Sequence, residues 1–595
     1  MAGEQAIRNR RWFAWIGLLI AAGALALRLA YLQERRAAPD FAYPDVDALY
    51  HDYWARGLAF DRWTPPPGMD DPGVRTRPYF RPPGYVWFLS AVYRATAGSY
   101  VAPRVAQHVL GVFGVVLALW LGTRLAGRLA GNLYAALLGS YWILIYFEGE
   151  LLDPTLNVVL LLAMLAASLL WLERRRSGWL FLAGLLLGGA AVVRPNMLAC
   201  YPAGLAWFGW VLKRRGPWLR AAGVWTVGLV LAVAPGAGRN WAVARDRVLV
   251  SSNAGINFYL GNNPDATGYC MAELPAWGPY RTCFDYPRIC RRVAEQVGRP
   301  LQDSEISAYF FAAGMRWARE NPGRALELLA KKAALFWGLP EVAHNTVESH
   351  GRRTSRILRR LPGDFPLFLC LGLLGAAGLR KHGAPDARRM ALFMGLFGGA
   401  YFLSVWPFFA AARYRVPILP IILFFAAAGL EQALAWLRTR AWRNLAGSAI
   451  ALLPLYGLLA WNWTGYREPV GRWHFDRGWA LVKQGRLGEA QEQFRQALAA
   501  DPGDVRARIN LGNLLGQMGD LAGAEREFRQ AVAAGDNPEA WNNLGYALYL
   551  QGRAAEAAPC FDRALALDPE NRQARNNREA ARAVWRPAEH ETLAP

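Results

Sequence analysis

The residues best suited to chemistry stand in one short stretch, Y-P-D-V-D-A-L-Y-H-D-Y-W-A-R-G-L-A-F, which runs from Tyr43 to Phe60. Three carboxylates and a histidine are crowded there among aromatic side chains. Carboxylate and imidazole groups often carry protons in general acid–base reactions. The stretch follows soon after the first long apolar run, so any such chemistry would take place at the edge of a membrane.

The composition indicates a multispanning membrane protein with a soluble tail. Of the 595 residues, 54% are hydrophobic, and apolar runs of membrane-spanning length recur up to about residue 465. Beyond that point the sequence is polar, Ala-rich and typical of helices. The net charge of +22 forms no single basic face, because many arginines stand in short clusters between apolar runs, as they do in cytoplasmic loops. We therefore expect no nucleic-acid binding.

Eleven apolar runs are predicted to cross the membrane. The first is too long for a signal peptide and lacks a cleavage site, so we expect it to be retained. The run at 83–97 is shorter and is entered through two prolines, which favours an interfacial or re-entrant segment. The predicted spans are 12–32, 104–123, 129–147, 154–172, 178–194, 197–212, 217–236, 364–380, 389–406, 416–433 and 443–463.

The basic clusters predict the orientation of these spans. With the N-terminus in the cytoplasm, every even-numbered turn is cytoplasmic, and each of these turns contains arginine or lysine. Counting 83–97 as a span would place those clusters outside, so the eleven-span topology is favoured. The outer face then holds the loops of about 33–103 and 237–363, the turns at 148–153, 194–196 and 413–415, and the tail. Polar residues from several segments thus converge on one face, which favours a shared site.

The tail repeats itself with a period near 34 residues from His474 onward. The pattern matches tetratricopeptide repeats, in which each unit is a pair of antiparallel helices. We therefore expect a membrane domain over 1–465, about three repeats over 466–580 and a flexible tail over 581–595. Such stacks usually offer a concave surface to a peptide or partner protein, although the array could instead only pack against the membrane domain. The repeated small and aromatic positions are Gly478, Ala490, Phe494 and Ala497, then Gly512, Ala524, Phe528 and Ala531, then Gly545, Ala557, Phe561 and Ala564.

The cysteines are few and show no metal-binding spacing. Cys270, Cys283 and Cys290 share one polar loop, where one disulfide could form if the loop faces an oxidising compartment. The sequence leaves open whether any two of them pair.

Several motifs together resemble the GT-C glycosyltransferases, most closely the family 39 group of protein O-mannosyltransferases and aminoarabinose transferases of lipid A. More narrowly, the chain is similar to bacterial members with a tetratricopeptide tail. This resemblance implies an all-α, polytopic fold with a helical solenoid. The motifs are P-D-V-D-A-L-Y-H-D-Y-W-A from Pro44, R-P-P-G-Y-V-W-F-L from Arg81, F-E-G-E-L-L from Phe147, R-P-N from Arg194, S-S-N-A-G-I-N-F-Y-L-G-N-N-P from Ser251 and R-Y-R-V-P-I-L-P from Arg413.

The resemblance also implies roles for individual residues. An Asp at the start of the first external loop is the general base of such families, and Asp47 matches that position best, with Tyr50 following at helical spacing. Where many relatives have Asp-Glu this chain has Asp47-Ala48, so Asp45 could share the role. Asp52 falls off the face of Asp47 on a helix, and we expect it to be solvated.

The donor implied by the resemblance is a sugar on a polyprenyl phosphate, whose leaving phosphate needs cationic partners. The candidates for binding the phosphate or the sugar are Arg81, Glu148, Arg194, Arg413, Arg415 and Tyr50, and those on the acceptor side are Asn257, Tyr259 and Asn262. A lone histidine, His344, is interpreted as structural. A monophosphate donor requires no metal, so we expect neither metal nor other cofactor.

The leading hypothesis is an inverting transferase of the bacterial inner membrane that moves this sugar to an acceptor outside the cytoplasm. The repeats favour a protein acceptor or partner. One alternative is a glycolipid or surface-polysaccharide acceptor, and another is a non-catalytic scaffold that recruits an envelope complex. A transporter is disfavoured because the notable charges lie at span ends rather than in their middles.

Overall fold

The computed structural model describes residues 2–269, 273–274, 277–280 and 282–584, with side chains from Trp15 onward. The chain forms two compact units. The first contains residues 1–37 and 44–467 and is called here the membrane unit. The second contains residues 38–43 and 468–595 and is called here the repeat unit.

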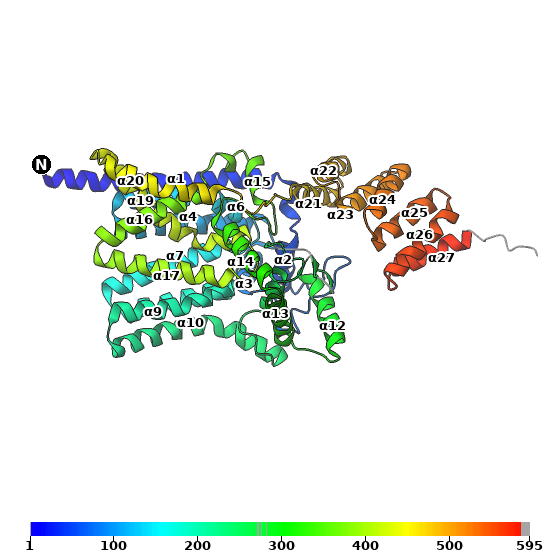
Figure 1. Cartoon of the computed structure of the whole chain (residues 1–595), viewed down its shortest axis with the longest axis horizontal. Coiled ribbons are helices and arrows are strands. Elements are labelled where there is room, and N and C mark those ends of the chain that lie inside the picture. Colours follow the sequence, from blue (N-terminus) through cyan, green and yellow to red (C-terminus); the bar gives the residue numbers. More distant parts are fainter. Residues whose placement is uncertain (1, 270–272, 275–276, 281, 585–595) are drawn as a thin grey trace, which may run out of the picture. The chain divides into compact units, whose positions relative to one another are not determined.

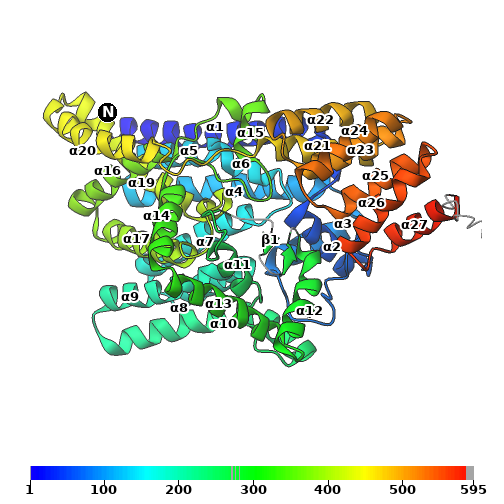
Figure 2. The same cartoon turned by 45° about the vertical axis from the view of Figure 1, so that its right-hand side comes forward.

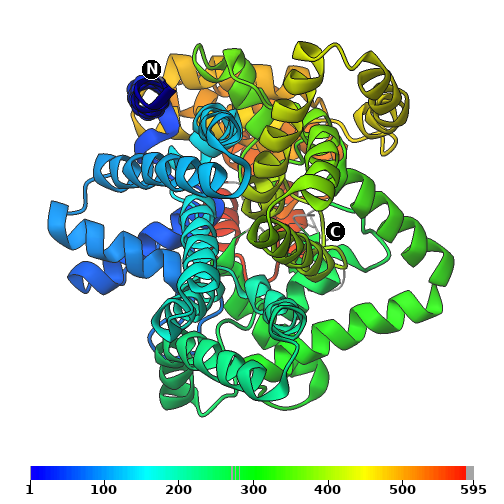
Figure 3. The ribbon, with the colours of Figure 1, turned by 90° about the vertical axis from the view of Figure 1, so that its left-hand side faces the viewer.

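The membrane unit is a bundle of long helices that run side by side in Figure 1 and are viewed end-on in Figure 3. Their apolar side chains share one core, to which α4, α7, α8, α16 and α19 all contribute. The bundle is formed by α1 (Ala2–Arg36), α4 (Val101–Ala126), α5 (Arg128–Ser140), α6 (Trp142–Glu148), α7 (Pro154–Arg174), α8 (Ser177–Val193), the 3₁₀ helix η2 (Pro195–Cys200), α9 (Tyr201–Leu212), α10 (Arg215–Ala244), α16 (Phe365–His382), α17 (Pro385–Val405), α18 (Ala412–Arg415), η5 (Val416–Ile418), α19 (Leu419–Arg438) and α20 (Trp442–Ala460).

Every predicted span falls on helical segments of this bundle. By length and composition, six helices of the described chain could cross a membrane, or seven if α5 and α6, which meet at 51°, form one bent span. The predicted ranges 178–194, 197–212, 364–380 and 389–406 lie on helices that do not meet this criterion. The protein is thus a multi-pass, all-α membrane protein, and the count of eleven remains a prediction.

The segments that join the spans at one end of the bundle carry shorter helices, and Figures 1 and 2 show α2, α3 and α12 gathered there. An aromatic core that includes Trp54, Tyr85, Trp277 and Phe310 holds them together. The run 83–97 is here the 13-residue helix α3. These elements are α2 (Val46–Phe60), α3 (Gly84–Thr96), α11 (Ala254–Gly261), a hairpin of β1 (Glu273–Leu274) and β2 (Gly278–Pro279), η3 (Cys283–Asp285), α12 (Tyr286–Val297), α13 (Asp303–Glu320), α14 (Pro322–Trp337), α15 (Glu348–Thr354) and η4 (Leu358–Arg360).

One glycine sets how closely α3 approaches α8. A β-carbon at Gly84 would collide with the backbone of Val192 and the side chain of Val193. Because glycine has no β-carbon, the N-terminus of α3 can lie against the end of α8. The close approach brings the segment that carries Arg81 next to the segment that carries Arg194.

The repeat unit consists of antiparallel helix pairs, as the repeat pattern predicts. The side chains of Phe494, Phe528 and Phe561 are buried beside the glycines of their own units, where a β-carbon would collide with the ring. The final helix continues to Val584, so 581–584 are helical, whereas 585–595 lie outside the described residues. The elements are η1 (Pro39–Ala42), α21 (Val470–Lys483), α22 (Leu487–Ala500), α23 (Val505–Gln517), α24 (Leu521–Ala534), α25 (Pro538–Leu550), α26 (Ala554–Leu567) and α27 (Arg572–Val584).

The three loop cysteines are only partly described. Cys283 and Cys290 are buried free thiols, whereas Cys270 lies outside the described residues. Arg81 Nε donates to the sulfur of Cys283 at 3.1 Å, and Arg77 Nη2 donates to that of Cys290 at 3.1 Å. Both thiols therefore serve here as weak hydrogen-bond acceptors.

Candidate active site

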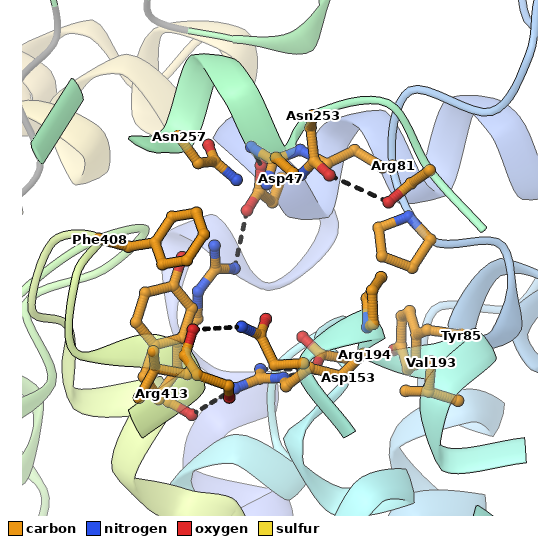
Figure 4. A pocket seen from close by; sticks show the side chains of 18 of the residues that line it. Asp47, Arg81, Tyr85, Asp153, Val193, Arg194, Asn253, Asn257, Phe408 and Arg413 are labelled. Atoms are coloured by element: carbon orange, nitrogen blue, oxygen red, sulfur yellow. Dashed lines mark hydrogen bonds and ion pairs between the residues drawn. The ribbon is translucent and has the colours of Figure 1, made fainter. Parts of the chain in front are cut away.

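Side chains from six separate segments turn toward one cavity of about 310 Å³ in the membrane unit (Figure 4). This volume is at the lower end of the range of about 300–1,000 Å³ that is typical of small-molecule sites. Five charged residues line it, together with polar and apolar groups. The lining includes Asp47, His51, Arg81, Tyr85, Asp153, Val193, Arg194, Asn196, Ser251, Asn253, Asn257, Ser404, Phe408, Arg413 and Tyr414.

Asp47 lies in the first turn of α2 and is 2% exposed. Its Oδ1 accepts from Arg81 Nη2 at 2.8 Å, and its Oδ2 accepts from Arg413 Nη1 at 2.7 Å. Asn345 Nδ2 also donates to Oδ2, at 3.1 Å. Three segments far apart in the sequence are thus joined at one carboxylate.

Electrostatics keep this carboxylate ionised. Burial raises the pKa of Asp47, but the neighbouring guanidinium groups of Arg81 and Arg413 outweigh burial and hold the pKa well below its usual range. A carboxylate whose pKa is lowered in this way holds its negative charge firmly and is correspondingly a weak proton acceptor.

A second ion pair lines the same cavity. Asp153, the residue before α7, accepts from Arg194 Nη2 at 2.6 Å and from Arg194 Nε at 3.0 Å through one oxygen, Oδ2. Arg194 Nη1 donates to the backbone oxygen of Arg413 at 2.9 Å, which links the two ion-pair groups. Among the charged residues that line the cavity, three arginines face two aspartates, an excess of one positive charge when all five are ionised.

Comparisons with known proteins find a matching family for part of each unit. Residues 80–237 match the family described as dolichyl-phosphate-mannose-protein mannosyltransferase. Residues 475–517 and 509–572 match the tetratricopeptide repeat family. The chain joins a mannosyltransferase-family segment to tetratricopeptide repeats. Both predicted resemblances are thereby confirmed, and no curated protein sequence matches the chain.

Several solved structures are similar to parts of the chain. The ArnT of Cupriavidus metallidurans bound to undecaprenyl phosphate is 14% identical, over 92% of this chain and 80% of that one, with a TM-score of 0.42. The oligosaccharyltransferase of Archaeoglobus fulgidus is 13% identical, over 75% of this chain and 55% of that one, with a TM-score of 0.38. The first tetratricopeptide domain of human RPAP3 is 24% identical, over 19% of this chain and 91% of that one, with a TM-score of 0.19.

Five of the predicted site residues line the cavity. They are Asp47, Arg81, Arg194, Arg413 and Asn257. The mannosyltransferase-family segment supplies Arg81 and Arg194 and also Asp153, which was not among the predicted site residues. The sequence held one signal for Asp153, since it ends the predicted outer turn at 148–153. His51 is a further lining residue that the sequence did not single out for a role.

Three predicted donor-side residues lie elsewhere. Glu148 is enclosed by Arg28 and His108 at 2.8 and 2.9 Å. Arg415 pairs with Glu341 at 2.5 Å and donates to backbone oxygens after α14. Tyr50 packs edge-on against Phe284 within the aromatic core. These three residues are absent from the lining of the cavity around Asp47.

The three remaining predicted residues also contact parts of the protein other than the cavity. Asp45 is the residue before α2, and its backbone oxygen accepts from the amides of the first turn. Tyr259 packs against Trp277 in the aromatic core. Asn262 donates to the oxygens of Phe258 and Pro407 and accepts from Lys332. None of Asp45, Tyr259 and Asn262 is in the lining.

The expectation for Asp52 is wrong. Its side chain is buried rather than solvated, because it accepts hydrogen bonds from Arg56, Tyr93 and Tyr100. It thereby ties α2 to α3 and to the start of α4.

His344 stacks on Phe409 at 5.3 Å between ring centroids. Within the described residues, no group of three or more His, Cys, Asp or Glu side chains could hold a metal ion.

Proposed function

We propose that this protein is an inverting glycosyltransferase that moves a sugar from a polyprenyl-phosphate donor to an acceptor on the extracytoplasmic side of the inner membrane. The observation that carries the proposal is the cavity in which arginines outnumber aspartates around the buried carboxylate of Asp47. An excess of cationic donors suits an anionic ligand, and arginine binds phosphate oxygens with its planar set of N–H groups.

The reaction would proceed by a single displacement. The acceptor oxygen forms a bond to the anomeric carbon while the bond from that carbon to the phosphate oxygen breaks. The acceptor hydroxyl passes its proton to a base in the cavity, which then gives it to water. The lipid phosphate leaves as an anion held by Arg81, Arg194 or Arg413, because fixed cations stabilise charge that develops on a leaving group. Asp47 supplies the fixed negative charge at the centre of this arrangement, and Asp45, which lies outside the cavity, is assigned no part. The donor is a monophosphate, so no metal ion is included.

The position of the reaction follows from the proposed topology. The basic turns predict a cytoplasmic N-terminus and place the loops that line the cavity, and the repeat unit, on the outer face. A donor whose lipid is anchored in the bilayer reaches only sites at the membrane surface, where the ends of the spans lie. The repeat unit supports a protein acceptor or partner, since such arrays usually bind peptides.

The test uses the full chain in lipid nanodiscs with a panel of radiolabelled polyprenyl-phosphate sugars and an envelope extract as the source of acceptors. We expect the wild type to transfer label from one of these donors and Asp47→Asn to lose that transfer, with turnover counted per folded molecule after size-exclusion chromatography. Asp70→Asn is the matched control, because Asp70 is exposed and pairs with the exposed Arg291. Absence of transfer from every donor by the wild type would contradict the proposal, and the labelled product would identify the acceptor.

A further inference from the structure

The membrane unit has a second and larger cavity, of about 920 Å³, which shares no lining residue with the cavity around Asp47. It lies among the last turns of α4, α16 and α19 and the first turns of α20. The turns that join α16 to α17 and α19 to α20 stand at the end of the bundle away from α2 and α12 (Figures 1 and 2). The basic residues of these turns predict that this end faces the cytoplasm.

Much of the wall of this cavity is apolar. It includes Leu125 of α4, Leu374 of α16 and Trp436 of α19. On the other side stands α20, which contacts α16 and α19 but has no buried residue along its whole length. A β-carbon at Gly447 of α20 would meet no atom within 4 Å, so the space in front of this glycine is open. Protein side chains therefore leave unfilled the gap that α20 borders.

Basic residues line the same cavity. Lys381 and His382 end α16, and Arg443 lies in the first turn of α20. All three are exposed, and within the part of the chain that the structure describes their side chains form no ion pair or hydrogen bond. Two cations from different helices thus stand beside one open, largely apolar space.

Among the described residues that line the cavity, Glu431 of α19 is the one carboxylate. It accepts a hydrogen bond from the backbone amide of Ala130, in the first turn of α5. The free amides of a helix N-terminus favour a negative charge at such a position. In the described chain Glu431 pairs with neither Lys381 nor Arg443. These two cations are left without a counter-ion from the described protein.

The positive-inside rule accounts for basic residues in these turns, but it does not account for a cavity that two of them share. A free anion would pair with the cations and leave the apolar wall uncovered. A zwitterionic lipid would cover the wall but bring its own ammonium group close to the cations. A lipid with a net negative headgroup satisfies both parts of the cavity, and basic pockets between membrane helices commonly bind such headgroups.

We propose that this cavity binds a phospholipid with an anionic headgroup from the leaflet on the side opposite the reaction. The phosphate pairs with Lys381 and Arg443, and an acyl chain covers the apolar wall between α19 and α20. The bound lipid holds α20 against the bundle. This site is separate from the proposed transferase site and does not depend on the proposed function.

The test measures binding of phosphatidylglycerol to the full chain in detergent by native mass spectrometry, with phosphatidylcholine of the same acyl chains as the comparison. We expect saturable binding of phosphatidylglycerol and weaker binding of phosphatidylcholine. A Lys or Arg near a membrane surface attracts an anionic lipid enough that Lys381→Gln or Arg443→Gln alone should weaken binding about 5-fold, and the two together about 30-fold. Both residues are exposed, so the variants should fold as the wild type does.

Two matched controls separate this cavity from the general charge and surface of the bundle. Arg388→Gln with Arg440→Gln removes two exposed cations from the same basic turns but outside the lining, and should leave binding unchanged. Gly447→Phe should fill the cavity and lower the affinity. Gly457→Phe should not, because Gly457 also has open space in front of it on α20 but does not line the cavity.

Equal affinity of the wild type and the Lys381→Gln, Arg443→Gln double variant for phosphatidylglycerol would overturn the proposal. Equal affinity of the wild type for the two lipids would also overturn it. Inorganic phosphate is the third arm of the experiment. If it displaces phosphatidylglycerol from the wild type, the cations bind a free anion and the assignment to a lipid is wrong. None of these outcomes bears on sugar transfer, which is measured separately.

Discussion

Two buried carboxylates of the membrane unit have partners of the same kinds but different surroundings. Asp47 and Glu148 are each 2% exposed, and each contacts arginine and lies near a histidine. Asp47 has two arginine partners and lines a cavity. Glu148, the last residue of α6, has Arg28 of α1 as its arginine partner and also contacts His108 of α4. The residue types alone do not distinguish the two sites.

The distinction lies in space and in charge. A β-carbon at Gly111 of α4 would occupy the position of the Glu148 carboxylate, so the glycine provides room that this carboxylate itself fills. At the other site, Glu148 forms an ion pair with Arg28. Arg28 also donates hydrogen bonds to the backbone oxygens of Ala24 and Gly139. The Asp47 group keeps an excess cation and open volume beside it. We therefore interpret Glu148 as a structural pair and Asp47 as part of a binding site.

The largest expected effect is the loss of sugar transfer when Asp47, but not Glu148, is replaced. Asp47→Asn should lower sugar transfer by about 100- to 10,000-fold, the range in which a single proton-transfer or charge-stabilising group contributes. Glu148→Gln should leave the turnover of each folded molecule unchanged. Turnover is measured per folded molecule after size-exclusion chromatography of each variant in nanodiscs. Equal loss in both variants would contradict the division between the two sites.

The second effect concerns stability rather than turnover. Replacing one partner of a buried ion pair leaves an uncompensated charge and costs about 3–5 kcal/mol, so Glu148→Gln should unfold at a markedly lower temperature. Replacing both partners, as in Arg28→Met with Glu148→Leu, should recover much of that loss, because no lone charge is left buried. Thermal unfolding in detergent checks both variants. If the double variant is less stable than Glu148→Gln, the pair has a role beyond charge balance.

Much of this arrangement could be predicted from the sequence. Apolar run length and the 34-residue period are local patterns, so the spans and the repeats were accessible without any knowledge of tertiary contacts. Four of the charged cavity residues, Asp47, Arg81, Arg194 and Arg413, were predicted because they stand in the motifs that carry the family resemblance, within loops and turns expected on one face.

The rest depends on tertiary packing that no local pattern reports. Arg413 and Arg415 are two residues apart, yet one reaches Asp47 and the other Glu341. Asp52 was expected in solvent, but Tyr93 of α3 and Tyr100 beside α4 enclose it. The ring of His51 contacts a backbone oxygen one hundred positions away, that of Leu151. Such pairings are properties of the folded chain and leave no periodic signal.

The third prediction uses the contrast between Arg413 and Arg415. Arg413→Lys should raise the donor KM by about 10- to 100-fold, because a hydrogen bond to a charged group is worth about 1.5–3 kcal/mol and lysine lacks the planar set of donors. Arg415→Lys should leave the donor KM unchanged, since Arg415 contacts Glu341 and backbone oxygens away from the cavity. Steady-state kinetics with varied donor check this pair. A larger KM change for Arg415→Lys would show that the donor site lies elsewhere.

The smallest effect concerns a buried lysine that has no carboxylate partner among the residues that the structure describes. Lys332 of α14 is 2% exposed and donates to Asn262 Oδ1 and to the backbone oxygen of Pro407, both at 3.0 Å. Burial lowers its pKa to about 7, whereas Arg81 beside Asp47 remains cationic, with its pKa raised by that carboxylate despite burial. Lys332 is therefore uncharged at mildly alkaline pH.

The pH dependence of stability tests this contrast. Between pH 7 and the ordinary lysine pKa of about 10.4, the unfolded chain binds more protons than the folded chain at this residue. The free energy of unfolding should therefore rise with pH in this window, and Lys332→Met should reduce that rise. Thermal unfolding from pH 7 to pH 9.5 measures both slopes, and Lys331→Met is the control, because Lys331, the neighbour of Lys332 on α14, is only partly buried. Equal slopes in the wild type and Lys332→Met would mean that Lys332 stays charged, and that a buried cation of this protein needs no carboxylate.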